Sequence, residues 1–160
     1  MIRKSNSVGK IKYENKRKKT LKQLIFKYLI KQGKFVYINP DIVEEHFPIT
    51  EPPSSAQKIL TVSGKDIGGI LNRTYKINEI EASIVREGYR SATLPELLIF
   101  SKKWNGKDTV FALGSSWGEE SYRLIPYLFS DRGARNLNLI CTGPHTRWLA
   151  DEQFLVVKKK

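Results

Sequence analysis

The last third of the chain holds four short runs of strand-forming residues, and this pattern limits the possible folds more than any other feature. Segments rich in Gly, Asp, Asn and Pro separate the runs, which lie at residues 109–113, 122–128, 137–141 and 154–157. The main helical patterns come before them. Helices first and strands afterwards predict the α+β class with a mainly antiparallel sheet, because strands joined by short turns pair antiparallel.

Capping signals and apolar periodicity predict four helices. They lie at residues 21–32, 40–47, 78–86 and about 94–103, with a weak fifth around 64–69 and short strands at 35–38 and 59–62. Capping boxes open the first and the fourth helix, and an Asn-Pro pair opens the second. We expect the buried face of the first helix to consist of Leu21, Leu24, Ile25, Tyr28 and Leu29, and that of the third to include Ile80, Ile84 and Val85.

Positive charge is concentrated at the start of the chain. Of the net charge of +12, residues 1–38 carry +11, because twelve Lys and Arg accompany a single acid, Glu14. This asymmetry favours a polyanionic partner, although a merely solubilising tail would have the same composition. We expect three parts, with a soft boundary in the Pro-rich stretch after residue 47: a flexible cationic leader at 1–19, a helical N-terminal segment at 20–50 and an α+β domain at 56–160.

The cations nearest the first helix are the predicted contacts for a nucleic acid or another polyanion. Four of them precede the helix, at the positive end of its dipole, where a bound phosphate would turn an unfavourable arrangement into a favourable one. The predicted phosphate-binding residues are Lys16, Arg17, Lys18, Lys19, Lys22 and Lys27. Phosphate contacts carry no base information, so the sequence does not distinguish RNA from DNA.

Residues 114–118 match the G-x-S-x-G pattern of serine hydrolases, with Ser116 in the nucleophile position. Asp131 and His145 follow in the order that such enzymes use. A nucleophile elbow needs a helix after the serine, however, and residues 122–125 are strand formers followed by a proline. We therefore expect a strand, a turn and a return strand here, and we predict no catalytic residue.

No cofactor or metal site is predicted. Cys141 and His145 are two possible zinc ligands without a second pair, and the Gly-rich residues 63–69 lack the P-loop pattern. A single cysteine fits a reducing compartment, and no apolar run is long enough to span a membrane. The basic start is not followed by the apolar segment of a secretory signal, so we expect a cytoplasmic protein.

The three tryptophans, Trp104, Trp117 and Trp148, are either core residues or exposed platforms for a ligand. An indole next to a strand more often closes a core. Beside an arginine it can instead bind a base or a sugar. Trp117, in a turn between two glycines, is the best candidate for exposure. The predicted ligand-binding residues are Trp117, Arg123, Arg135, Arg147 and Trp148.

Residues 88–98, "GYRSATLPELL", fit the pattern G-x-R-x-x-T-x-x-E-L. Together with "ALGSSW", "RLIPYL" and "FLVVKK", they resemble C-type-lectin-like domains of the group related to the formylglycine-generating enzyme. The same pieces are also similar to those of small bacterial proteins to which no activity can be attached. Over residues 88–158, the resemblance implies a binding scaffold with a ligand site in its loops. The chain lacks a cysteine pair and a calcium-ligand cluster, so the resemblance implies neither oxidase activity nor calcium-dependent sugar binding.

Two functions are compatible with these features. The first is a non-enzymatic binding protein whose cationic leader contacts the phosphates of a nucleic acid or ribonucleoprotein. The alternative is a lectin-like domain that binds a ligand or a protein partner, with a leader that only solubilises the chain. The first predicts an affinity that falls steeply with salt, and the second does not require one.

Overall fold

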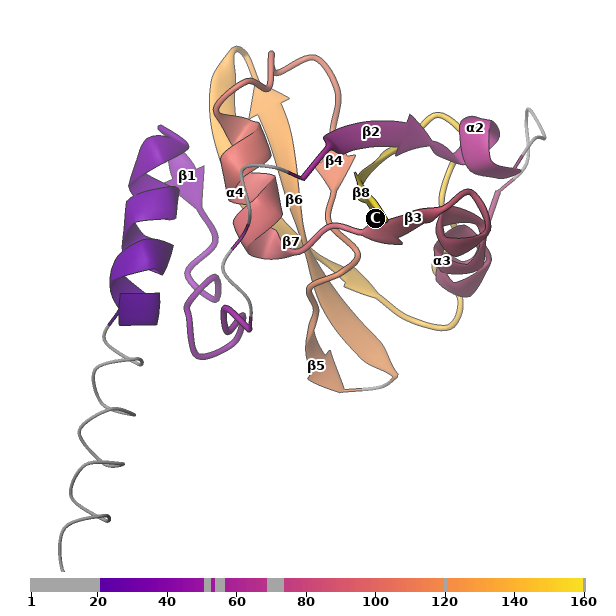
Figure 1. Cartoon of the computed structure of the whole chain (residues 1–160), viewed down its shortest axis with the longest axis horizontal. Coiled ribbons are helices and arrows are strands. Elements are labelled where there is room, and N and C mark those ends of the chain that lie inside the picture. The colour runs from indigo at the N-terminus through magenta and orange to yellow at the C-terminus, as the bar shows by residue number, and fades with distance from the viewer. Residues whose placement is uncertain (1–20, 51–52, 54–56, 69–73, 120, 160) are drawn as a thin grey trace, which may run out of the picture.

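The computed structural model describes residues 21–50, 53, 57–68, 74–119 and 121–159. Within these ranges, a basic helical N-terminal segment is followed by helices and a sheet of eight strands, which confirms the α+β prediction (Figure 1). None of the described helices is both long enough and apolar enough to cross a membrane. The predicted leader, residues 1–19, and the expected capping residue Thr20 lie outside the described residues.

Most predicted elements are present, with bounds close to those expected. The strands are β1 (Tyr37–Ile38), β2 (Ile59–Ser63), β3 (Tyr89–Ser91), β4 (Val110–Phe111), β5 (Trp117–Glu119), β6 (Tyr122–Asp131), β7 (Ala134–Thr142) and β8 (Gln153–Lys158). The helices are the N-terminal helix (residues 21–32), α2 (Gly64–Gly68), α3 (Ile77–Arg86) and α4 (Leu94–Ser101). The sequence does not predict β3 or β5, because three residues are too few to show an alternating pattern.

The sheet is mixed but mainly antiparallel. Its strand order is β1-β7-β6-β4-β8-β2, while β3 pairs with β8 and β5 pairs with β6. Among the described strands, β1 runs parallel to β7 and β4 runs parallel to β8, and the other pairs are antiparallel. The longest pairing is the β6–β7 hairpin, which extends from the pair Arg123–Thr142 to the pair Asp131–Ala134.

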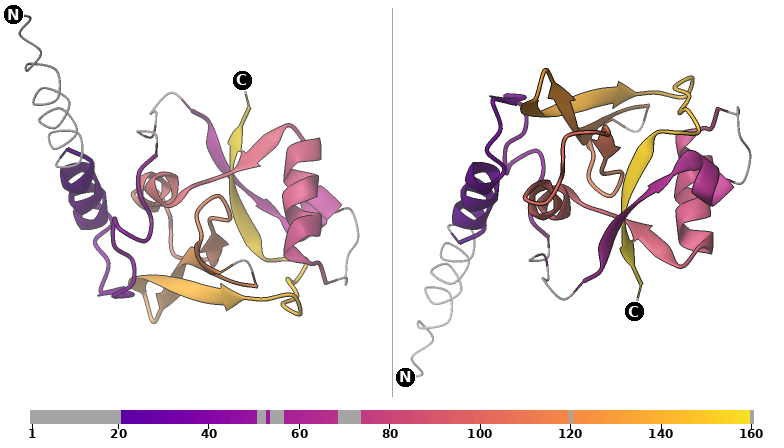
Figure 2. Two further views of the ribbon diagram at one scale, coloured as in Figure 1. Left: turned by 90° about the horizontal axis from the view of Figure 1, so that it is seen from below. Right: turned by 90° about the horizontal axis from the view of Figure 1, so that it is seen from above.

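Two clusters of buried side chains cover opposite faces of the sheet near β8. Leu155 and Val157 belong to the cluster that includes α4 and the N-terminal helix, whereas Phe154 and Val156 belong to the cluster that includes α3. Figure 2 shows the N-terminal helix and α4 at one side of the molecule, and α2 and α3 at the other. Because β8 is buried on both faces, its sequence is a continuous apolar run rather than an alternation.

The N-terminal helix buries a different face from the one predicted. Phe26 and Leu29 lie in the core, where they share a cluster with residues of the sheet. Leu21, Leu24 and Tyr28 are exposed, so three of the five residues expected in the buried face are not buried. Both faces carry apolar residues at helical spacing, and periodicity therefore does not determine which face packs.

Residues 39–47 form successive turns, so the prediction of a helix at 40–47 is wrong. The backbone N–H of Asp41 donates to Oδ1 of Asn39 at 3.0 Å. The amide of Asn39 also donates to Oδ1 of Asn138 on β7, at 2.8 Å. Asn39 thus closes a local turn and attaches it to the sheet, and this arrangement competes with its role as a helix cap.

Helices α3 and α4 agree with their sequence signals. Ile80 and Ile84 of α3 are buried as predicted, but Val85 is exposed, because adjacent helical residues point about 100° apart. Helix α4 begins at the predicted capping box, in which Thr93 and Glu96 each accept a hydrogen bond from the other's backbone. Its start is thereby fixed next to β3, at the position where the candidate site forms.

Candidate functional site

The structure describes two of the predicted phosphate-binding residues, Lys22 and Lys27, and places both on the N-terminal helix. The other four, Lys16, Arg17, Lys18 and Lys19, lie outside the described residues. The described part of the N-terminal segment adds Lys31 and Lys34, and no acid occurs between residues 21 and 40. Residues 21–40 therefore carry positive charges only, whereas Asp41, Glu44 and Glu45 follow in the turns after β1, and the two glutamates line a pocket together with Lys27 and Lys31.

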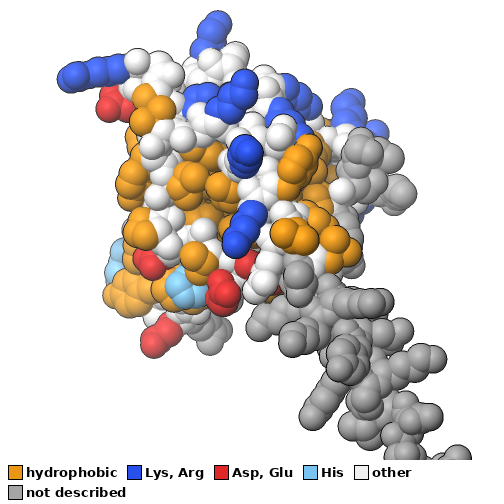
Figure 3. All heavy atoms as spheres, turned by 90° about the vertical axis from the view of Figure 1, so that its left-hand side faces the viewer, with side chains coloured by type: hydrophobic (Ala, Val, Ile, Leu, Met, Phe, Trp, Pro, Cys, Tyr) orange, Lys and Arg blue, Asp and Glu red, His pale blue; other side chains and the backbone are white. Residues whose placement is uncertain are grey.

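Two lysines that follow α4 extend the same cationic surface. Lys102 and Lys103 follow the last turn of α4, and Nζ of Lys102 lies 5.6 Å from the centroid of the Tyr28 ring on the N-terminal helix. In Figure 3, which shows this side of the molecule, most lysine and arginine side chains lie in the upper half and most acidic side chains in the lower half. Within the described ranges, every ion pair involves an arginine, and no lysine is paired with an acid. These lysine charges are thus available to an external anion.

Trp117 is half-buried at the start of β5, and not in a turn as expected. Its ring stacks on that of His46, with the centroids 3.5 Å apart and the planes 7° from parallel. The same side chain packs against the core that contains α4. The turns at residues 39–47 therefore cover the indole that the sequence indicated as most exposed.

Trp148 and Trp104 are core residues. Trp148 is 1% exposed and makes edge-to-face contacts with Phe111 and Phe154, at centroid distances of 4.7 and 5.5 Å. Because no face of its ring reaches the surface, the prediction that Trp148 binds a ligand is wrong. Trp104 is buried as well, and its indole N–H donates to the carbonyl oxygen of Asp108 at 3.0 Å.

The three predicted ligand-binding arginines lie apart, and the tryptophan contact that one of them makes is buried: the guanidinium of Arg135 lies 5.6 Å from the ring centroid of Trp104, which is 7% exposed. Arg123 pairs with Glu81 of α3 at 3.2 Å, on the face of the sheet opposite to Trp117. Arg135 lies at the other end of the β6–β7 hairpin, where its guanidinium donates to the carbonyl oxygen of Ser101. Arg147 is exposed and donates to carbonyl oxygens of its own loop.

The three residues of the hydrolase pattern are also apart. Asp131 ends β6 at one end of the long hairpin, and His145 follows β7 at the other end. Eight residues of β6 separate those ends, which corresponds to roughly 27 Å. Ser116 precedes a strand instead of a helix, as the sequence predicts. This trio therefore cannot form a charge-relay system in the described structure.

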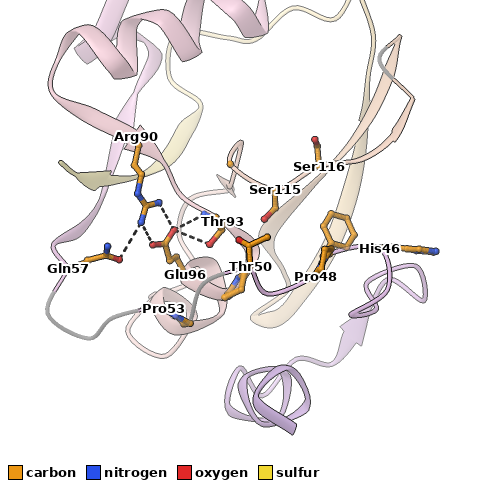
Figure 4. A pocket seen from close by; sticks show the side chains of 13 residues that line it. His46, Pro48, Thr50, Pro53, Gln57, Arg90, Thr93, Glu96, Ser115 and Ser116 are labelled. Carbon is orange, nitrogen blue, oxygen red and sulfur yellow. Dashed lines mark hydrogen bonds and ion pairs between the residues drawn. The ribbon is translucent and has the colours of Figure 1, made fainter. Parts of the chain in front are cut away.

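A cavity of about 330 Å³ opens between the loop that begins at His46, the start of α4 and the turn after β4 (Figure 4). Its polar side chains come from segments far apart in the sequence. They are His46, Thr50, Gln57, Arg90, Thr93, Glu96, Ser115 and Ser116, and Phe47, Pro48, Pro53 and Pro95 supply apolar surface.

One side of the cavity is a hydrogen-bonded group centred on Glu96. Nη1 and Nη2 of Arg90 donate to its two carboxylate oxygens at 2.9 and 2.5 Å. The backbone N–H and the hydroxyl of Thr93 donate to the same carboxylate at 2.8 and 3.0 Å. These three residues are the polar residues of the motif G-x-R-x-x-T-x-x-E-L, so the motif marks a junction between β3 and α4.

The environment of Glu96 favours its ionised form. Burial alone would raise the pKa of this carboxyl, but the hydrogen bonds from Arg90 and Thr93 and the charge of Arg90 together lower the pKa below its usual value. The arginine and the acid that line the cavity neutralise each other. The other polar groups of the cavity are uncharged or weakly charged side chains such as Thr50, Gln57 and Ser116, and Oε1 of Gln57 accepts a hydrogen bond from Arg90 at 3.3 Å.

The turn after β4 completes the cavity through close backbone contact with β3. The N–H of Gly114 donates to the carbonyl oxygen of Ala92 at 2.9 Å, and a Cβ at Gly114 would lie 2.7 Å from that oxygen. The hydroxyl of Ser115 accepts a hydrogen bond from the backbone N–H of Leu94, at 2.8 Å, in the first turn of α4. The first Gly of the G-x-S-x-G match and the residue that precedes Ser116 thus serve packing and helix capping.

No cluster of three or more His, Cys, Asp and Glu side chains that could hold a metal ion occurs in the described ranges. Cys141 is exposed on β7.

No protein-family model, curated protein or solved structure matches this chain. The likeness to C-type-lectin-like domains therefore rests on the short sequence motifs, and the structure by itself shows the α+β class.

Proposed function

We propose that this protein is a non-enzymatic nucleic-acid-binding protein whose cationic N-terminal segment contacts phosphates. The observation that carries this proposal is the lysine surface: Lys22, Lys27, Lys31 and Lys34 lie in a segment without acids, and Lys102 and Lys103 adjoin it. None of these lysines is neutralised by an acid of the described residues.

Lysines that are not paired with a described acid suit a sequence-independent polyanion. Each lysine that neutralises a phosphate releases condensed counterions, and this release favours binding at low salt. The lysines preceding the helix, Lys16, Lys18 and Lys19, with Arg17, would add to the same field, since the net charge of residues 1–38 is +11. Such contacts orient the nucleic acid without reading its bases.

The experiment is a binding titration with a labelled oligonucleotide and two variants of equal net charge. In the first, Lys22, Lys27, Lys31 and Lys34 are changed to Gln; in the control, the exposed Lys58, Lys65, Lys76 and Lys158 are changed to Gln. We expect a marked loss of affinity in the first variant and a small one in the control. Equal losses would show that overall charge, and not this segment, attracts the oligonucleotide.

A second candidate function is binding of an uncharged polar ligand, such as a sugar, as the lectin-like alternative requires. The cavity next to α4 favours it, because Thr50, Gln57 and Ser116 line the cavity and its charged groups are internally paired. Titration with a panel of neutral sugars tests this function. If the cavity binds a sugar, the affinity should not fall as the salt concentration rises and should not change when residues 1–19 are removed. The affinity should decrease when Ser116 is changed to a bulky residue.

A further inference from the structure

One face of the β1–β7–β6 part of the sheet carries two adjacent rows of aromatic and amide side chains. The pairing register aligns Tyr37 with Asn136 and Asn136 with Phe129, so these three side chains point to the same face. The next row on that face contains Asn138, paired with Tyr127, and Asn39, whose backbone N–H continues the β1 ladder by donating to Leu137.

Contacts between the two rows hold these side chains in place. The rings of Tyr127 and Phe129 are tilted by 32°, with their centroids 5.5 Å apart. Tyr127 is paired with Asn138 across the hairpin, and Oδ1 of Asn138 accepts a hydrogen bond from the Asn39 amide. Tyr127 also contacts the core residue Phe111, at a centroid distance of 5.3 Å. The rings of Tyr127 and Phe129 are therefore presented on a paired strand instead of on a loop.

No described helix covers this face. The N-terminal helix and α4 pack on the opposite face, with Leu128 and Leu137, and α3 lies over the β4–β8 end of the sheet. Both views in Figure 2 show the β6–β7 hairpin as an outer layer with the helices on its other side or beyond its end. Tyr37 is 45% exposed, and Tyr127 and Phe129 are half-buried, so their rings are accessible from solvent.

The charged surroundings of this face are asymmetric. On the β1 side, the strand follows directly from the acid-free segment, and the exposed Lys34 lies three residues before Tyr37. At the hairpin end, the exposed Arg132 is balanced by Asp131. The lysines of the N-terminal helix lie on the opposite face of the sheet, so a strand that contacts both the lysines and the rings would cross the β1 edge beside Lys34.

We infer that this aromatic face is a stacking platform for the unpaired bases of a single-stranded nucleic acid, with Tyr37 and Phe129 as its central rings. The inference rests on the proposed function, because the lysines must hold the phosphates. Bases in a duplex are already stacked on each other, whereas those of a single strand can turn onto exposed rings. The side chains of Asn136 and Asn138 lie between the rings and are used within the protein: Asn136 is 6% exposed and its amide donates to the carbonyl oxygen of Ala134, while Oδ1 of Asn138 accepts from Asn39. The platform therefore acts through its rings, and its amides keep the strands in register.

The test compares a single strand with a duplex of the same sequence, using the full chain and variants of the platform. The full chain is expected to bind the single strand more tightly. Tyr37→Ala should weaken that binding about tenfold without altering its salt dependence, while Tyr37→Phe keeps the ring and the affinity. Tyr122→Ala is the matched control, because Tyr122 is 62% exposed at the opposite end of β6. Phe129→Leu, a conservative change on a paired strand, should also weaken binding.

The outcomes separate the platform from the proposed function. Salt-dependent binding that Tyr37→Ala and Phe129→Leu both leave unchanged would overturn the platform and leave the lysine contacts standing. Equal affinity for duplex and single strand would do the same. Salt-independent binding of a sugar, lost in Tyr37→Ala, would overturn the inference and assign this face to a different ligand. The absence of any salt-dependent binding would contradict the proposed function itself.

Discussion

Arg90 and Glu96 form a two-point ion pair that joins β3 to the first turn of α4, with Nη2 of Arg90 2.5 Å from Oε1 of Glu96. Glu96 is 3% exposed, and its carboxylate also accepts two hydrogen bonds from Thr93. A carboxylate buried to this extent must be paired and hydrogen-bonded to remain ionised. The pair therefore holds α4 in its place beside the cavity.

The first prediction is that Glu96→Gln destabilises the protein by about 2 kcal/mol, because it removes the buried negative charge to which Arg90 and Thr93 donate hydrogen bonds. The loss is smaller than for a fully buried pair, since the Arg90 side chain is 38% exposed and solvent screens it. Urea unfolding measures this difference. Glu87→Gln, which breaks the exposed pair between Arg86 and Glu87, is the control and should change stability little. Similar effects of the two changes would contradict a special role for Glu96.

The second prediction concerns the stability of the protein at low pH. Because the pKa of Glu96 is lowered in the folded protein, the carboxylate contributes stability above its unfolded pKa of about 4.5, and this contribution is lost as the pH falls through the folded pKa. The free energy of unfolding should therefore decrease as the pH falls below about 4.5 and towards the lowered pKa of Glu96 in the folded protein. In Glu96→Gln the decrease should be smaller, although Asp66, whose pKa is also lowered, retains its own contribution. Parallel acid profiles of the two proteins would contradict the role of Glu96.

The third prediction separates steric crowding from backbone conformation at two glycines. A Cβ at Gly114 would lie 2.7 Å from the carbonyl oxygens of Ser91 and Ala92, so Gly114→Ala should cost about 3 kcal/mol of stability. Gly88 has a φ of +79° but open space around it, so Gly88→Ala should cost only about 1 kcal/mol. Thermal unfolding compares them. A Gly114→Ala protein as stable as the parent would contradict the close approach of the turn to β3.

The fourth prediction concerns the stack between His46 and Trp117. His46→Ala removes the ring that covers one face of the indole, so Trp117 should become more accessible to water and to a soluble quencher. Trp104 and Trp148 are buried and should contribute little to the change. Tryptophan fluorescence with acrylamide measures the accessibility, and His145→Ala is the control because His145 is exposed in another loop. An unchanged quenching constant in His46→Ala would contradict the stack.

Much of the fold could be predicted from local signals. The Thr93–Glu96 capping box and the apolar run of β8 each specify one structure, because capping and two-sided burial leave few alternatives. The N-terminal helix is ambiguous, since Leu21 and Leu24 repeat at the same spacing as the buried Phe26 and Leu29. Which face of the helix is buried depends on how it packs against α4 and the sheet. The turn at Asn39 depends on Asn138, a residue 99 positions away, so no local pattern could reveal it.

The candidate sites were only partly predictable. The concentration of charge at the start of the chain is a property of the sequence itself. By contrast, Trp117 and Arg123 are close in sequence but lie on opposite faces of β5 and β6, which their spacing alone does not indicate. The rows formed by Tyr37 and Phe129 depend on a parallel pairing of β1 with β7, a long-range contact without a local signal.

The most direct measurement of the central claim is the salt dependence of oligonucleotide binding by the full chain. If about five cations such as Lys16 to Lys19 and Lys22 neutralise phosphates, the plot of log affinity against log salt concentration should have a slope of about −3.5 to −4.5. A slope in that range, reduced in the variant without Lys22, Lys27, Lys31 and Lys34, would support phosphate binding by the N-terminal segment. A flat response, or no binding at low salt, would contradict it.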